Sequence, residues 1–275
     1  MKKLLYIEGA ILGAVLLLVA ILAATGVIRL KNSTPSEPTG TQSSEPSTAP
    51  TDPSTDPTVP GPLPEHSPVE GSYFDDAVFI GDSVSMKLSY YEAATNKLGK
   101  AQFLVAGSLG SGNALWPVSE ESVHPAYNGV KMRLEDSVPL TGAKKLYIML
   151  GMNDLALYGP QGAVDNLVTL LDLILAKTPG IEIFIQSMTP VAKNSTIVST
   201  GGLNNDKVRA YNALLLETAL ERGWNFVDVA SIMFDSQGHL KEKYCSDLGA
   251  MGVHFTNAGC EAWVQYLLTH TKQGD

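Results

Sequence analysis

The residues Gly81-Asp82-Ser83 and His254 are of the types that carry out nucleophilic acyl transfer. A serine hydroxyl is a weak nucleophile until a neighbouring base accepts its proton, and an imidazole, which titrates near neutral pH, suits that task. Taken singly, Gly-Asp-Ser is also typical of an ordinary turn, and a lone histidine is often a solvated or core residue. The interpretation therefore depends on which residues accompany them and on where the fold places them.

Two further motifs contain donors suited to an anionic oxygen. "AGSLGSGN" contains Gly107, Gly110 and Gly112, and "GMNDL" contains Asn153. The tetrahedral intermediate of acyl transfer needs hydrogen-bond donors aimed at its oxyanion, and glycine lets the backbone approach closely. We expect three donors: the Ser83 N–H, a glycine N–H of the second motif and the Asn153 side-chain amide.

Short apolar runs alternate with helix-like stretches from residue 77 onward. Strands are predicted at 77–80, 102–106, 145–150, 181–188 and 225–230, and helices within 84–99, 161–180, 204–223 and 257–270. Strands that are apolar throughout and separated by helices predict an α/β fold with a parallel sheet covered on both faces. Three motifs directly follow a strand, and His254 precedes the last helix. All four should meet at the carboxyl edge of the sheet, where sites form in such folds.

With this order of motifs, residues 74–270 resemble the SGNH (GDSL-type) serine hydrolases. "FIGDSVSM" resembles the block that carries the nucleophile, here Ser83, and "LGMNDL" the block with the oxyanion amide, here Asn153. "VAGSLGSG" resembles the block with the oxyanion glycine; its spacing from the strand points to Gly110, with Gly107 as the alternative. "GVHFTNAG" resembles the block with the base, His254. The resemblance implies a flavodoxin-like three-layer α/β/α sandwich and ester hydrolysis or acyl transfer without a cofactor.

The chain departs from the family pattern at the acid that orients the histidine. The family usually has D-x-x-H, but Met251 stands in the place of the aspartate, and methionine cannot accept the imidazole N–H. Three interpretations follow: Asp247 folds back to meet His254, a main-chain carbonyl or water orients the ring, or the protein has lost catalysis and retained binding. The intact Ser83, Asn153 and His254 argue against the loss of catalysis.

The N-terminal segment predicts a membrane anchor over residues 1–30. Lys2 and Lys3 precede an uncharged, largely apolar run at residues 9–28, long enough as a helix to cross the hydrocarbon core of a bilayer. A cleaved signal peptide, which would leave a secreted protein, is the alternative. The two lysines favour an internal N-terminus and an extracytoplasmic location for the rest of the chain.

Residues 31–70 predict a disordered spacer, and residues 71–275 form the expected hydrolase domain. Between Lys31 and Pro68 lie ten of the sixteen prolines of the chain, with hardly a large apolar residue to build a core. The net charge of -9, without basic clusters, argues against nucleic acid as a partner.

The remaining candidate residues have ordinary alternatives. Cys245 and Cys260 could form a disulfide that closes a loop of about 15 residues, or they could be two separate buried thiols. No metal site is expected, because His124 and His239 lack metal-ligand spacing. Trp116 could line an acyl or sugar subsite or could simply pack at the periphery. The same two alternatives apply to Tyr127.

Together these features predict a membrane-tethered extracytoplasmic serine esterase. The expected substrate is a carboxylic ester, first of all an O-acetyl group on a cell-surface or extracellular polysaccharide. The alternatives are a lysophospholipase or lipase, an O-acyltransferase of the same fold, and a non-catalytic glycan-binding protein. The sequence does not predict an oligomeric state.

Overall fold

The computed structural model of the protein describes residues 61–199 and 202–273. The predicted membrane anchor, residues 1–30, and most of the predicted spacer lie outside the described residues. Within these described ranges, no helix is long and apolar enough to cross a membrane.

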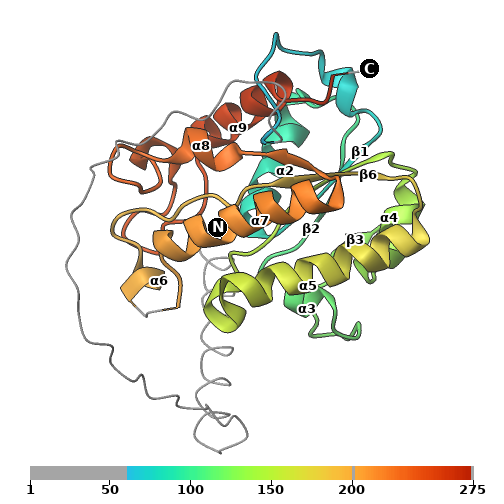
Figure 1. Ribbon diagram of the computed structural model, residues 1–275, viewed down its shortest axis with the longest axis horizontal. Coiled ribbons are helices and arrows are strands. Elements are labelled where there is room, and N and C mark those ends of the chain that lie inside the picture. The colour runs from blue at the N-terminus through green and yellow to red at the C-terminus, as the bar shows by residue number, and fades with distance from the viewer. Residues whose placement is uncertain (1–60, 200–201, 274–275) are drawn as a thin grey trace, which may run out of the picture. The chain divides into compact units, whose positions relative to one another are not determined.

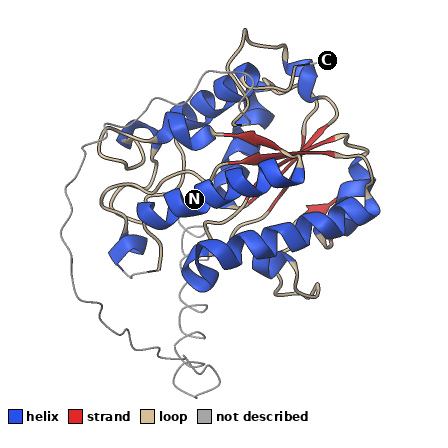
Figure 2. Ribbon diagram, in the orientation of Figure 1, coloured by secondary structure: helices blue, strands red, loops and turns tan. Residues whose placement is uncertain are grey.

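Five parallel strands form the central sheet, in the order β2-β1-β5-β6-β7. Each lies within or next to a run that the sequence predicted as a strand, and Figure 2 shows helices on both faces of the sheet. The strands are β1 (Ala77–Gly81), β2 (Gln102–Val105), β5 (Lys145–Met149), β6 (Glu182–Gln186) and β7 (Asn225–Val227). The expected α/β fold with a central parallel sheet is therefore confirmed.

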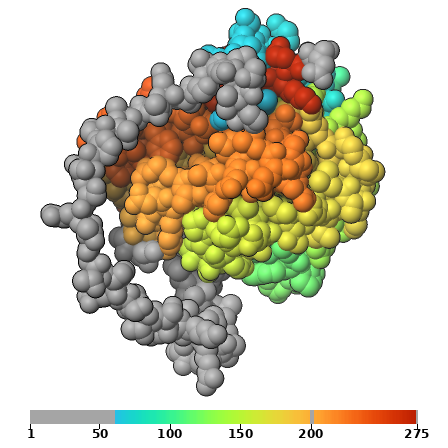
Figure 3. All heavy atoms as spheres, in the orientation of Figure 1, coloured from blue at the N-terminus to red at the C-terminus, as the bar shows by residue number. Residues whose placement is uncertain are grey.

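Two buried clusters, one on each face of the sheet, give the fold its three layers. Alternate residues of β1 divide between them: Val78 and Ile80 belong to one cluster, Ala77 and Phe79 to the other, as the pleat of a strand requires. The first cluster contains side chains of α4 (Leu134–Thr141), α5 (Leu155–Lys177) and α7 (Asn205–Arg222), and α5 and α7 cover the face seen in Figures 1 and 3. The second contains side chains of α2 (Ser83–Thr95), α8 (Val229–Met233) and α9 (Asn257–Thr269).

A row of aromatic rings crosses the second face of the sheet. Phe103, Phe79, Tyr147 and Phe184 are neighbours in the strand register, and successive rings stack with centroid distances of 5.2, 4.8 and 4.4 Å. Stacked aromatic pairs on adjacent strands stabilise a sheet beyond the area they bury. The row therefore helps to set the register of β2, β1, β5 and β6, which fixes where each strand ends.

The region after the second motif contains short elements that the sequence did not predict. They are α3 (Ser111–Ala114), the antiparallel pair β3 (Ala126–Tyr127) and β4 (Val130–Lys131), and α4. Ahead of the helix predicted from residue 161, α5 contains a further short helical segment from Leu155, and Gly159, with φ 66° and ψ 177°, interrupts the helix between the two. The remaining short elements are η1 (Gly71–Phe74), α6 (Thr196–Ser199) and η2 (Glu242–Tyr244).

Residues 61–70, which the sequence placed in the spacer, lie along the folded unit. The N–H groups of Leu63, His66 and Val69 donate to the carbonyls of Phe226, Thr269 and Leu268 at 2.8, 2.9 and 2.9 Å. These hydrogen bonds fasten the segment to β7 and to the end of α9.

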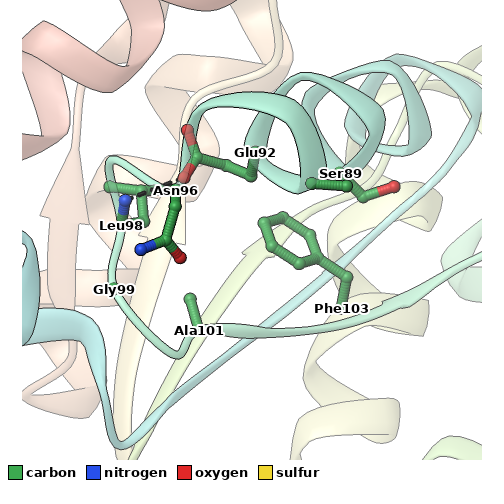
Figure 4. Close-up of a pocket in the computed structure, with 8 residues that line it drawn as sticks. Ser89, Glu92, Asn96, Leu98, Gly99, Ala101 and Phe103 are labelled. Atoms are coloured by element: carbon green, nitrogen blue, oxygen red, sulfur yellow. Dashed lines mark hydrogen bonds between the residues drawn. The ribbon is translucent and has the colours of Figure 1, made fainter.

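A hollow of about 220 Å³ lies between the C-terminal half of α2 and the start of β2 (Figure 4). Its lining includes the carboxylate of Glu92 and the ring of Phe103. Ser83 stands at the other end of α2, so the hollow is separate from the edge of the sheet where the predicted motifs meet.

Cys245 and Cys260 are separate buried thiols, so the disulfide considered from the sequence is not present. Burial raises the pKa of Cys245 to about 11 and that of Cys260 to about 12. A thiol with so high a pKa has very little of the reactive thiolate at neutral pH.

We expect Ellman's reagent to react slowly with the native protein and to titrate two thiols after unfolding in guanidinium chloride without reductant. Burial and the raised pKa values protect both thiols only in the folded state. No titratable thiol in the unfolded, unreduced chain would instead indicate a disulfide.

Candidate active site

Ser83 is the first residue of α2, and only Asp82 separates it from the end of β1. Asp82 caps this helix: its Oδ1 accepts the N–H of Val84 at 2.9 Å. The first N–H groups of a helix have no partner within the helix, so the Ser83 N–H is oriented for an external acceptor. The turn thus places both a hydroxyl and a donor at the carboxyl edge of the sheet.

His254 lies between Ser83 and Asp247 in one hydrogen-bonded relay. Its Nε2 is 3.0 Å from Ser83 Oγ, and its Nδ1 is 2.9 Å from Asp247 Oδ2. A carboxylate only accepts, so Nδ1 carries the donated proton and Nε2 is left to accept the proton of the serine hydroxyl. The arrangement is that of a Ser-His-Asp triad.

Asp247 is held by three donors besides the imidazole. Its Oδ1 accepts the N–H groups of Val253 and His254, both at 3.1 Å, and the thiol of Cys245 at 3.2 Å. Burial raises the pKa of this carboxyl, but the hydrogen bonds from His254 and Cys245 outweigh it, and the net pKa lies below its ordinary value. Asp247 is therefore ionised at neutral pH. The contribution of Cys245 was not foreseen, because spacing alone does not show where a thiol points.

The loop between Asp247 and His254 makes this contact possible without an aspartate at Met251. Gly249 and Gly252 adopt φ of 76° and 70°, in the left-handed region that favours glycine. The carbonyl of Met251 accepts the hydroxyl of Ser195, which ties the loop to the segment before α6. Of the three interpretations of the missing acid, the geometry corresponds to the one in which Asp247 folds back to His254.

The expected oxyanion donors Asn153 and Gly110 belong to a hydrogen-bonded network that reaches the residue before Ser83. Asn153 Nδ2 donates to Leu109 O at 3.0 Å and lies 3.3 Å from Asp82 Oδ2, so one amide joins the glycine loop to the residue before Ser83. The Gly110 N–H, however, donates to Asn113 Oδ1 at 2.8 Å. Its expected role in an oxyanion hole therefore requires that Asn113 release it.

Asp154 fixes the glycine loop against the start of α5. Its two carboxylate oxygens accept the N–H groups of Ser111 and Gly112, each at 2.9 Å, and the residue is buried. Burial raises the pKa of Asp154 against the opposing effect of these donors. A Cβ atom at Gly110 would lie 2.8 Å from the Asp154 carboxylate, so only glycine fits there.

Asp82 is a second buried carboxyl in the same network. Burial raises its pKa to about 6 against the opposing effects of the Val84 N–H and of His254, and the charge of Asp154 adds to the rise. At neutral pH this carboxyl is ionised at a cost to stability, because its ordinary value near 3.8 applies in the unfolded chain.

The candidate aromatic and histidine residues outside the four motifs have other surroundings. Trp116 is 55 % exposed just after α3, whereas the Tyr127 hydroxyl donates to Leu140 O at 2.9 Å and its side chain packs on the core. His124 bonds to Ala114 O, and His239 lies 3.2 Å from the Asn205 amide. In the part of the chain that the structure describes, no group of three or more side chains could hold a metal ion.

The free energy of unfolding of the Asp82→Asn variant, relative to that of the wild type, should rise as the pH increases from about 4 to 7. A buried aspartate with a raised pKa binds its proton more tightly when folded, so the wild type loses stability as it ionises through this window, whereas asparagine does not ionise. The difference between the folded pKa of about 6 and the ordinary value of 3.8 limits this relative gain in stability to roughly 3 kcal/mol. Urea unfolding at several pH values measures it; a stability difference that does not change with pH would contradict the assignment.

Residues 79–262 match the model of the GDSL-like Lipase/Acylhydrolase family. No curated protein matched the chain significantly.

Two solved structures share the fold. One, from Bacteroides fragilis, is assigned as an acylhydrolase; it is 20 % identical with a TM-score of 0.56, over 70 % of this chain and 83 % of that one. The other is a GDSL-like lipase from Bacteroides thetaiotaomicron; it is 18 % identical with a TM-score of 0.55, over 74 % of this chain and 88 % of that one. At these identities the likeness concerns the fold. Because the family model covers more than half of its length, the chain belongs to the GDSL-like lipase/acylhydrolase family, a family of ester hydrolases.

Proposed function

We propose that Ser83, His254 and Asp247 are the catalytic triad of a serine esterase. The observation that carries this proposal is the unbroken relay from Ser83 Oγ through both nitrogens of His254 to Asp247 Oδ2, with links of 3.0 and 2.9 Å. A glycan-binding protein without catalysis would have no need of such a relay.

In the first half-reaction the Ser83 oxygen attacks the ester carbonyl carbon while His254 Nε2 accepts the hydroxyl proton. The resulting imidazolium donates from Nδ1 to Asp247, whose low pKa keeps it a carboxylate. The Ser83 N–H, the Asn153 amide and the Gly110 N–H bind the oxyanion. The carbon–oxygen bond to the alcohol then breaks, and the alcohol leaves with the proton from Nε2.

In the second half-reaction the acyl group is transferred from Ser83 to water. His254 Nε2, now neutral, accepts a proton from a water molecule, and the hydroxide oxygen attacks the acyl carbon. When the tetrahedral intermediate collapses, the carboxylic acid departs and the proton returns to Ser83 Oγ. No group outside the chain and the two substrates is needed for either half.

We place the domain outside the cytoplasm, tethered by residues 1–30, with O-acetyl groups of a surface or extracellular polysaccharide as the substrate. The support is the apolar run at residues 9–28 followed by a proline-rich spacer, which suits an enzyme that works on a large, immobile substrate.

A substrate with a longer acyl chain is the second candidate, because apolar side chains are exposed beside the site. Leu157 and Tyr158, in the first turns of α5 and soon after Asn153, are 54 % and 40 % exposed. Leu248, next to Asp247, is 49 % exposed. Such a surface could cover an acyl chain.

A series of p-nitrophenyl esters from acetate to decanoate, together with acetate release from an O-acetylated polysaccharide, separates the two candidates. For the polysaccharide esterase, we expect acetate to give the highest kcat/KM among the esters and the polysaccharide to release acetate. A preference for decanoate without acetate release would support the lipase.

The Ser83→Ala variant should lose esterase activity by roughly 10⁴-fold or more in kcat and should no longer be labelled by a fluorophosphonate. Without the hydroxyl, neither the acyl-enzyme nor the phosphonyl adduct can form. Ser89→Ala is the matched control, since Ser89 lies on the same helix and its hydroxyl donates only to Met86 O. Labelling or turnover that survives in Ser83→Ala would contradict the assignment of the nucleophile.

The Asp247→Asn variant should lower kcat by roughly 10²- to 10⁴-fold while leaving the fold intact. The amide cannot stabilise the imidazolium as the carboxylate does. Asp206→Asn, at an exposed position in the first turn of α7, is the control. If the turnover of Asp247→Asn equals that of the wild type, a main-chain carbonyl or water must orient His254 instead.

A further inference from the structure

The amide side chain of Asn113 bonds to two backbone groups of the glycine loop. Its Oδ1 accepts the N–H of Gly110 at 2.8 Å, and its Nδ2 donates to the carbonyl of Ser108 at 2.9 Å. An N–H group has a single hydrogen, so this bond and a strong bond to a substrate oxygen exclude one another. The Gly110 donor is thus closed in this structure.

The Gly110 N–H is connected through Asn153 to the turn that bears Ser83. Asn153 Nδ2 donates to Leu109 O, the carbonyl of the peptide unit that contains the Gly110 N–H, and lies 3.3 Å from Asp82 Oδ2. Asp82 directly precedes the nucleophile. The peptide that Asn113 closes is therefore the one that Asn153 joins to the turn bearing Ser83.

We propose that Asn113 is a latch on the oxyanion hole: it holds the Gly110 N–H in the free enzyme and releases it when the substrate oxygen becomes negatively charged. The inference rests on the proposed function, since it assigns a positioning role toward a donor of that site. Asn113 itself does not contact the substrate; it acts through Gly110.

The loop can keep its shape while the latch turns away. The carboxylate of Asp154 holds the N–H groups of Ser111 and Gly112, and Asn153 holds the carbonyl of Leu109, independently of Asn113. Asn113 is only half-buried, so its side chain can rotate toward solvent without a change in the backbone.

The exchange of acceptors favours the transition state over the bound ester. A hydrogen bond to an ionised acceptor is roughly twice as strong as one between neutral groups. The neutral ester carbonyl is no better an acceptor than the amide of Asn113, but the oxyanion is. Release of Gly110 therefore coincides with the development of charge, which is where binding energy accelerates a reaction.

Two substitutions at Asn113 should change the reaction rates in opposite directions. In Asn113→Ala the latch is removed, and we expect kcat/KM for p-nitrophenyl acetate and the rate of fluorophosphonate labelling to rise together by about 3- to 5-fold, the equivalent of one ordinary hydrogen bond. In Asn113→Asp a charged acceptor holds the N–H more firmly, and both rates should fall by about 10-fold.

The control is Asn225→Ala, which removes an amide that bonds to Ile183 O at the start of β7, at the other edge of the sheet. We expect both of its rates to equal those of the wild type. Thermal unfolding of each variant shows whether a change in rate reflects a change in stability. A loss of both rates in Asn113→Ala and Asn113→Asp alike would show that Asn113 only supports the loop.

Unchanged rates in Asn113→Ala would show that the Gly110 N–H is not used, which leaves Gly107 as the glycine donor, and would overturn the latch. Failure of the proposed function itself looks different: the wild type would then not be labelled by the fluorophosphonate, or the label would persist in Ser83→Ala. A wild type that is labelled at Ser83, with no gain in Asn113→Ala, refutes the latch alone.

Discussion

The hydrogen bond of 2.9 Å between Asp247 Oδ2 and His254 Nδ1 is the interaction on which the candidate site depends. It fixes the tautomer of the imidazole and turns Nε2 toward Ser83. The carboxylate can serve in this way because two main-chain N–H groups and a thiol hold its other oxygen. A loop that replaces the usual D-x-x-H spacing thus presents an acid to the same nitrogen by a different route.

Buried carboxyls connect the loops at the carboxyl edge of the sheet. Asp82 caps α2 and lies near Asn153, whereas Asp154 binds the N–H groups of the glycine loop. Burial raises the pKa of both, so each costs stability when ionised. The hydrogen bonds offset part of this cost, and they hold the serine turn, the glycine loop and Asn153 together before any substrate binds.

The donors of the site differ in their readiness for an oxyanion. Ser83 offers its N–H from the first turn of a helix, whereas the Gly110 N–H is bonded to Asn113. The framework of the site is complete, but the Gly110 N–H is bonded to Asn113, and the Asn153 amide donates to Leu109 O and lies near Asp82. Selectivity for the charged transition state over the neutral ester follows from this difference, because only a stronger acceptor than an amide displaces Asn113.

The order of strands and helices, the four motifs and their position at the strand ends could be predicted from the sequence, because apolar runs, helix caps and turn residues are local signals. Asn204, for example, caps α7 and Gly223 ends it, at the two limits of the helix predicted within 204–223. The sequence left open which group faces His254, whether the cysteines are bonded and what holds the Gly110 amide. These depend on side-chain directions and on loops such as 247–254, in which two glycines reverse the chain. Only the packed structure brings residues from separate segments within hydrogen-bond distance, so only the tertiary structure decided these points.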